Sequence, residues 1–297
     1  MDDTLDRRPD AASVWEYQDR AGRPIPDCST VSRVSGQRHA IVTGGSRGLG
    51  RSIAALLAAR GDRVSLIARD LAQLQESASS MRGHVRCAVA DVTDRAELDH
   101  VVAGLVDQSG PCDVLVAAAG AAEPGYFAQL GDDVFRRQIE LNYFGVLNAV
   151  RTVTPSMIER RTGSLIAVAS AAALVGVFGY SAYAPSKFAV RGLMEVLRCE
   201  LKPQGIHVAC VFPPDMDTPG FAAENLTKPE ECARISSGIK PRHPDDVARA
   251  VLRGLDRRRF MITADPQTAL LARAAGILSP VLHRVIDRTV NDVSGAT

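Results

Sequence analysis

Apolar and polar residues follow one another along the chain in a pattern that predicts alternating strands and helices from residue 39 onward. Short, almost continuously apolar runs such as "HAIVTGG" and "CDVLVAAAG" predict buried strands. Longer stretches between them repeat apolar residues every three or four positions, which predicts amphipathic helices. The expected strands cover residues 39–45, 63–70, 85–93, 112–120, 163–170 and 206–214. The expected helices cover residues 50–61, 70–83, 94–110, 132–161, 182–205 and 243–255.

Strands that alternate with helices in this way build right-handed βαβ units and a parallel sheet. Strands that are apolar on both sides suit a sheet whose two faces are covered. The sequence therefore predicts an α/β fold with a doubly wound parallel sheet of the Rossmann type, as a single domain over residues 38–265. Ligands of such sheets bind beyond the carboxyl ends of the strands, so we expect the functional loops to share one edge.

The two ends of the chain do not follow this pattern. Residues 1–37 are polar and contain several prolines, and we expect a flexible or surface-draped extension rather than a signal peptide. Residues 266–297 form an amphipathic C-terminal segment in which arginines interrupt an apolar stretch. We expect this segment to pack on the sheet or on a partner subunit, with contact to a membrane surface as the alternative. Pro280 is expected to kink any continuous helix there.

Composition excludes several classes of function. The chain has 297 residues, with 35 basic and 34 acidic side chains and a net charge of +1, whereas a nucleic-acid partner would require a basic patch. The 6 cysteines and 6 histidines lack metal-ligand spacing, so we expect buried, reduced thiols and no metal site. The most apolar window, 165–179, is too short to cross a bilayer. We therefore expect a cytoplasmic protein, with peripheral membrane contact as the alternative.

The stretch "TGGSRGLG" at 43–50 lies where the first expected strand meets the first expected helix. Gly44 permits a tight turn, Gly48 lets the backbone approach a pyrophosphate, and Gly50 allows close packing of the helix. The free N–H groups of the helix N-terminus favour phosphate. Helix capping alone would explain one glycine but not three at this spacing, so we predict a dinucleotide site.

The second expected strand ends in "ARD", and this end distinguishes the two nicotinamide cofactors. A carboxylate here binds the ribose 2′-hydroxyl of NAD, whereas an arginine accommodates the 2′-phosphate of NADP. Arg69 occupies the strand end, Arg47 lies in the glycine loop, and the guanidinium fork suits phosphate. Asp70 keeps NAD as the less favoured alternative. Asp91, at the end of the third strand, is expected to meet the adenine amino group or else to cap the next helix.

The stretch "YAPSK" places Tyr183 and Lys187 four positions apart, on one face of a helix. Ser170 ends the fifth expected strand, and Asn142 lies within the preceding helix. This set suits hydride transfer to or from a carbonyl, because a proton must reach the carbonyl oxygen. The Lys187 ammonium is expected to lower the pKa of Tyr183. Ser170 is expected to donate a hydrogen bond to the carbonyl oxygen.

The residues named so far, with "DV" at 91–92, resemble in order and spacing the classical short-chain dehydrogenase/reductase family over residues 39–265. The resemblance implies that Asn142 positions a water that relays protons through Lys187, which also holds the nicotinamide ribose. Ala118 departs from it, because the family commonly has asparagine there. The cofactor-binding residues that the resemblance implies are Gly44, Ser46, Arg47, Gly48, Leu49, Gly50, Arg69, Asp91, Val92, Ala119, Gly120, Tyr183, Lys187, Pro213 and Thr218.

Residues 213–229, "PPDMDTPGFAAENLTKP", interrupt the pattern after the sixth expected strand. This segment and the stretch "VFGYSAYAPSKFAVRGLMEVLRCELKP" closely resemble the 3-ketodihydrosphingosine reductases, which reduce the 3-keto group of a long-chain sphingoid base with NADPH. The resemblance implies that Thr218 meets the cofactor carboxamide and that the chain from Pro219 onward forms a lid over the substrate.

A substrate with an amine head and a long alkyl chain requires an acid near the carbonyl and an apolar channel behind it. The candidate acids are Asp215, Asp217 and Glu224, although Asp217 is equally suited to cap the turn around Thr218. The candidate channel residues are Leu174, Val177, Phe178, Met216 and Phe221.

We therefore expect an NADPH-dependent reductase of a lipid-like ketone. The alternatives are a dehydrogenase or reductase of another bulky ketone or β-ketoacyl substrate, and a nucleotide-sensing protein without catalysis. The intact set of Ser170, Tyr183 and Lys187 argues against a sensor, because a sensor needs no proton donor. The resemblance further implies a homodimer or homotetramer.

Overall fold

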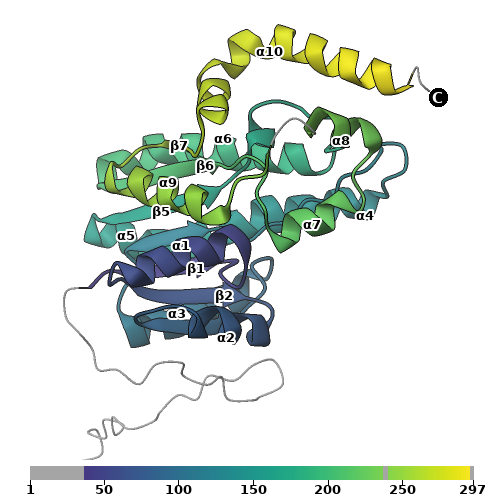
Figure 1. The fold of residues 1–297 in the computed structure, drawn as a ribbon. Coiled ribbons are helices and arrows are strands. Elements are labelled where there is room, and N and C mark those ends of the chain that lie inside the picture. The colour runs from purple at the N-terminus through teal and green to yellow at the C-terminus, as the bar shows by residue number, and fades with distance from the viewer. Residues whose placement is uncertain (1–36, 237–239, 295–297) are drawn as a thin grey trace, which may run out of the picture.

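The computed structural model describes residues 37–236 and 240–294, and a seven-stranded sheet forms its centre (Figure 1). The strands lie in the order β3-β2-β1-β4-β5-β6-β7, and every neighbouring pair is parallel. They span β1 His39–Thr43, β2 Arg63–Ala68, β3 Val85–Val89, β4 Val114–Ala117, β5 Gly163–Val168, β6 Ile206–Phe212 and β7 Met261–Thr263. The predicted doubly wound parallel sheet is confirmed.

Helices cover both faces of the sheet, and each face has its own hydrophobic core. Helices α1, α2 and α9 pack on one face, and α3, α5 and α6 on the other. Successive side chains of a strand point to opposite faces, so Ile41 joins one core and Val42 the other. The helices named here span α1 Gly48–Ala59, α2 Leu71–Ser79, α3 Arg95–Ser109, α5 Gly145–Arg160, α6 Tyr183–Leu201 and α9 Pro244–Asp256.

The expected helix over 132–161 is divided by a π-helical turn. It consists of α4 Asp132–Ile139, the π-helix η1 Glu140–Phe144 and α5. A π turn inside a helix often marks a functional position, because the extra residue shifts the side chains that follow. Here the turn contains Asn142.

Three elements near the sheet edge were not predicted. Helices α7 Pro219–Asn225 and α8 Glu230–Ser236 lie in and just after the proline-rich segment, and Thr218 caps α7 by accepting a hydrogen bond from the Phe221 amide. Proline at the first helical position is favourable, so the prolines help α7 to begin. Strand β7 has only three residues, too few to show a period.

The C-terminal segment forms α10 Pro266–Ser294, which is bent in Figure 1 and contacts β7 and α8. Ala272 is buried against the core of the α6 face, which agrees with packing on the body of the protein. No helix in the described ranges is long and apolar enough to span a bilayer. The predicted N-terminal extension lies almost entirely outside the described residues.

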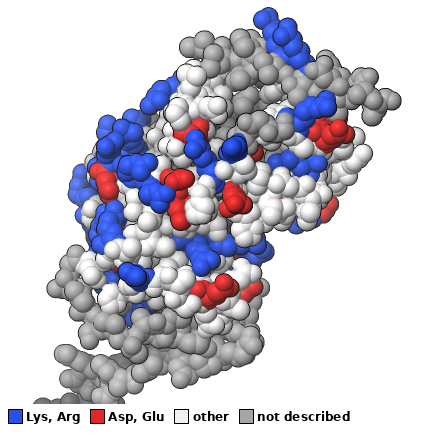
Figure 2. Space-filling view, viewed as in Figure 1, with Lys and Arg blue, Asp and Glu red and all other residues white. Residues whose placement is uncertain are grey.

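The charges and cysteines of the described residues agree with what the composition predicted, except at one cysteine. On the face drawn in Figure 2, acidic and basic side chains lie interspersed. Among the described cysteines, Cys87, Cys112, Cys210 and Cys232 are buried free thiols. Cys199 is exposed, so the prediction of buried thiols is wrong at this position.

Candidate active site

The glycine loop between β1 and α1 is packed so closely that side chains are excluded. Gly44 has φ +69°, and a Cβ there would lie 2.7 Å from the backbone nitrogen of Ala119 at the end of β4. A Cβ on Gly50 would lie 2.3 Å from the carbonyl oxygen of Gly44. Both glycines are therefore required for the turn itself, as the sequence predicted for Gly44.

The first turn of α1 fits a phosphate. It contains no acidic residue, and Gly48 adopts φ +55° at its start. A Cβ on Gly48 would stand 3.5 Å from the methyl group of Thr218, so this loop and the segment after β6 face each other closely. Leu49 is buried beneath the loop, and Ser46 is half-buried. Free backbone N–H groups and small residues at this point form a cradle for the phosphates of a dinucleotide.

Arg47 and Arg69 extend the basic character of this edge. Arg47 is exposed at the N-cap of α1, where its side chain makes no capping bond. The Arg69 side chain is 73% exposed, and its Nη1 lies 3.9 Å from Oδ2 of Asp91. Both guanidinium groups are thus accessible to an added phosphate.

The carboxylates nearby are already engaged in local structure. Asp70 caps α2, accepting hydrogen bonds from the backbone and side-chain nitrogens of Gln73 at 3.1 and 3.0 Å. Asp91 accepts bonds from the amide and hydroxyl of Thr93 at 3.0 and 2.8 Å, while Asp94 caps α3. Asp70 is thus engaged in capping α2, and the preference for NADP over NAD stays a prediction. The expected contact of Asp91 with adenine stays a prediction.

Tyr183 and Lys187 lie in the first turns of α6, beside the end of β5. A side-chain hydrogen bond joins Ser170 to Tyr183. The Lys187 ammonium is 5.7 Å from the centre of the Tyr183 ring and donates a hydrogen bond of 3.0 Å to the Val168 carbonyl. The structure therefore brings together the three residues that the sequence proposed for proton transfer to a carbonyl.

Burial dominates the ionisation of these groups. Desolvation raises the pKa of Tyr183 above its ordinary value, the hydrogen bond from Ser170 opposes the rise, and the charges of Glu224 and Asp215 add to it. Desolvation also lowers the pKa of Lys187 to about 8. The Lys187 ammonium, 5.7 Å from the ring centre, does not offset this desolvation, and its expected lowering of the pKa of Tyr183 stays a prediction. Tyr183 therefore keeps its proton at neutral pH.

Asn142 connects the π turn to the loop after β4. Its side chain accepts a 3.1 Å hydrogen bond from the Ala121 amide and donates a 3.0 Å bond to the Ala121 carbonyl. A Cβ on Gly120 would lie 2.8 Å from Oδ1 of Asn142 and 3.1 Å from the Lys187 nitrogen. Gly120, Asn142 and Lys187 thus meet at one point. The water relay implied for Asn142 stays a prediction.

The remaining expected cofactor residues line the same edge. The Pro213 carbonyl accepts a 2.9 Å bond from the Ala171 amide, which ties the end of β6 to η2 (Ala171–Ala173) after β5. Val92 is buried, and its Cγ2 would be 2.7 Å from a Cβ on Gly145 in α5. Ala119 borders the glycine loop through the close contact at Gly44 described above.

A small cluster of apolar residues adjoins Tyr183 on the side of α7 and α8. Val177 and Phe178 pack there against Tyr180, Ala184 and Cys232. Phe221 lies over this region and faces the Lys228 ammonium at 4.6 Å. Met216 is different, because it packs against the core of the α1 and α9 face and not in this cluster. The structure therefore groups Val177 with Phe178, places Phe221 against Lys228, and separates Met216 from this cluster.

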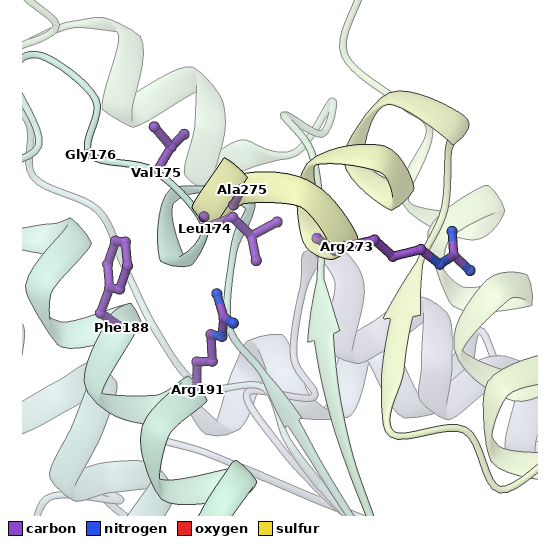
Figure 3. Close-up of a pocket in the computed structure, with 9 residues that line it drawn as sticks. Leu174, Val175, Gly176, Phe188, Arg191, Arg273 and Ala275 are labelled. Carbon is purple, nitrogen blue, oxygen red and sulfur yellow. The ribbon is translucent and has the colours of Figure 1, made fainter. Parts of the chain in front are cut away.

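A cavity of about 410 Å³ opens next to Leu174, between the loop after η2, α6 and α10 (Figure 3). Figure 3 shows the Arg191 side chain reaching toward Leu174, and its Nη1 lies 3.4 Å from the Ala173 carbonyl. The residues that line the cavity are Leu174, Val175, Gly176, Phe188, Arg191, Ala272, Arg273, Ala275 and Gly276. The cavity thus lies on the α10 side of η2, next to Leu174.

Two features near the site were not predicted from the sequence. Lys228 is buried beside Tyr180 and Phe221 and bonds to Glu224, and Tyr126 donates a 2.9 Å hydrogen bond to Glu231 of α8. The only available signal was the position of Tyr180 three residues before Tyr183, which places two aromatic rings at the start of one helix.

Comparison with known proteins gives one consistent result. The family model described as short chain dehydrogenase matches residues 38–229. The 3-ketodihydrosphingosine reductase of Dictyostelium discoideum is 38% identical, over 84% of this chain and 81% of its own length. The 3-dehydrosphinganine reductase of Danio rerio is 38% identical, over 82% of this chain and 76% of its own length. A short-chain dehydrogenase from Sphingobium yanoikuyae in complex with NADPH has a TM-score of 0.71 and 26% identity, covering 83% of this chain and 95% of that one.

Proposed function

The chain belongs to the short chain dehydrogenase family, and on that premise we propose that it is an NADPH-dependent reductase of 3-ketodihydrosphingosine, the 3-keto form of a long-chain sphingoid base. The observation that carries this proposal is the 38% identity, over 84% of this chain, to a relative with that name. The apolar cluster beside Tyr183 and the cavity next to Leu174 support a long-chain substrate.

The residues present fit a nicotinamide dinucleotide. The side-chain-free loop at Gly44 and Gly48 would hold the pyrophosphate, and Lys187 and Thr218 would hold the nicotinamide end. When bound, the cofactor supplies the hydride that the carbonyl carbon receives. Two accessible arginines and the engagement of Asp70 in capping favour NADPH over NADH.

Side chains of the protein itself would supply the proton and stabilise the charges that form. Tyr183 donates its hydroxyl proton to the carbonyl oxygen, and its raised pKa keeps that proton in place at neutral pH. Ser170 donates a hydrogen bond to the same oxygen as negative charge develops on it. Lys187 stabilises the phenolate left behind, and Asn142 supports the return of a proton through Lys187.

The test of this function is a substrate comparison. Purified protein with NADPH is expected to reduce 3-ketodihydrosphingosine with a higher kcat/KM than a short-chain ketone, because only the long chain fills the apolar space beyond Ser170. Cofactor consumption and product are measured together. Turnover of the short ketone without turnover of the sphingoid ketone contradicts the substrate assignment.

Replacing Arg47 and Arg69 together by alanine is expected to raise the KM for NADPH about 10-fold to 100-fold, since charge-assisted hydrogen bonds to the 2′-phosphate would be lost. The KM for NADH should change little, because NADH lacks that phosphate. Steady-state kinetics with both cofactors check this prediction. An equal loss for the two cofactors would show that the arginines do not select the phosphate.

We also propose that α5 and α6 form the interface of a homodimer or homotetramer. Large apolar side chains are exposed on or beside these two helices, namely Phe144, Ile158, Phe188 and Val196. Exposed apolar groups favour association, because burying them in an interface removes their surface from water. Light scattering of the purified protein reports the oligomeric state.

A further inference from the structure

A cation-binding cluster lies beside Tyr183, and one cation of the chain already occupies part of it. The Lys228 side chain is 4% exposed, although it carries an ammonium. Its nitrogen lies 3.2 Å from Oε1 of Glu224, 4.6 Å from the centre of the Phe221 ring and 5.8 Å from that of Tyr180. The Tyr180 hydroxyl donates a hydrogen bond to the same carboxylate. A carboxylate with aromatic faces around it is a favourable site for an ammonium group.

The charges of this cluster do not balance. Lys228 neutralises Glu224, and Asp215 adds a second carboxylate, so two negative charges and one positive charge leave a net charge of −1. Asp215 is half-buried and makes no side-chain hydrogen bond to another described residue. Desolvation raises its pKa, and the charge of Lys228 opposes that rise. A partly buried carboxylate without a bonded partner favours a ligand that brings a positive charge.

The excess negative charge of this cluster lies near Tyr183, where the substrate carbonyl would receive its proton. Asp215 and Glu224 are close enough for their charges to raise the pKa of Tyr183. The rings of Tyr180 and Tyr183 are 5.7 Å apart, so the cluster continues directly into the proposed proton donor. In 3-ketodihydrosphingosine the amine is on the carbon next to the carbonyl, and an amine in such a position is mostly protonated at neutral pH. Its ammonium must therefore lie near Tyr183.

We propose that Asp215 binds the ammonium group of the amino-ketone substrate, while the Lys228–Glu224 pair fixes the cluster at one net negative charge. This inference rests on the proposed function and adds the residue that distinguishes an amino ketone from a neutral ketone. Asp217 is the alternative acid on the same segment, but it is exposed. The structure thus separates the two aspartates, and it favours Asp215, the one that the sequence had no capping alternative for.

The test compares two substrates that differ only in charge: 3-ketodihydrosphingosine and 1-hydroxyoctadecan-3-one, in which hydrogen replaces the amine. Asp215→Asn is expected to lower kcat/KM for the amino ketone about 10-fold to 100-fold, as for the loss of one charged hydrogen bond. Its effect on kcat/KM for the neutral ketone should be several times smaller, because there the Asp215 charge acts only through the pKa of Tyr183. Asp217→Asn is the matched control and should affect neither substrate. Asp215→Glu keeps the charge and should retain much of the preference for the amine.

The outcomes separate this inference from the proposed function. If the wild-type protein reduces neither ketone, the proposed function itself fails. If the wild type reduces the amino ketone and Asp215→Asn keeps the full preference for it, only the present inference is overturned. Equal losses on both ketones, in a variant with unchanged thermal unfolding, also overturn it, because Asp215 would then act on the carbonyl chemistry. Selective loss of the amino ketone supports it.

Discussion

Replacing Tyr183 with phenylalanine is expected to lower kcat for ketone reduction about 10²-fold to 10⁴-fold, the usual range for loss of a general acid. The change removes the hydroxyl that is hydrogen-bonded to Ser170 and leaves the ring against Tyr180. Binding of NADPH should be almost unchanged, because the cofactor contacts come mainly from the glycine loop. Steady-state kinetics and a fluorescence titration with NADPH measure the two effects separately.

Tyr143 provides the matched control for this substitution. It lies in the π turn next to Asn142 and packs its ring edge-to-face against Phe144. Tyr143→Phe should retain wild-type turnover. If Tyr183→Phe keeps most of the activity, Tyr183 is not the proton donor. If the wild type binds NADPH and reduces none of the ketones tested, the result favours the alternative of a nucleotide-sensing protein.

Replacing Gly44 with alanine is expected to lower the free energy of unfolding by about 2–4 kcal/mol and to abolish stabilisation by NADPH. The new Cβ would be 2.7–2.8 Å from backbone atoms of Ala118 and Ala119, which cannot rotate away. The positive φ of +69° adds backbone strain for any residue with a Cβ. Thermal unfolding with and without NADPH measures both parts of the prediction.

Gly192→Ala is the control for the effect of a methyl group as such. Gly192 lies on α6 and is exposed, and a Cβ added there would meet no atom within 4 Å. Alanine favours a helix over glycine by about 1 kcal/mol, so this variant should be as stable as the wild type or more stable. Light scattering checks that the added methyl group, between Phe188 and Val196 on α6, leaves the oligomeric state unchanged. A Gly44→Ala protein that unfolds and binds NADPH like the wild type would contradict the function given to this loop.

The fold was predictable because the spacing of apolar residues depends on how each element packs. Apolar residues recur every three or four positions in an amphipathic helix and are almost continuous in a strand that is covered on both faces. The continuous apolar run at 206–212 could only be a strand covered on both faces, and it became β6. The elements that were missed carry weaker signals. Strand β7 is held by β6 through only three pairs, and α7 begins at a proline, which suggested a turn rather than a helix.

The candidate site was predictable where function depends on spacing along one element. The interval of four residues between Tyr183 and Lys187 fixes a common face of α6. Properties that depend on burial were not predictable, since desolvation raises the pKa of Tyr183, which the spacing of residues in the sequence does not show. The burial of Lys228 also depends on how α7 folds back over Tyr180, which no local pattern shows.

The central claim is hydride transfer to the keto carbon of a sphingoid base. The most direct measurement uses NADPH that carries deuterium at the transferable position, with 3-ketodihydrosphingosine as substrate and mass spectrometry of the product. We predict an amino alcohol that carries the deuterium on the former keto carbon, and almost none of it with Tyr183→Phe. Unchanged 3-ketodihydrosphingosine, in a wild-type protein that is folded and binds NADPH, would contradict this claim.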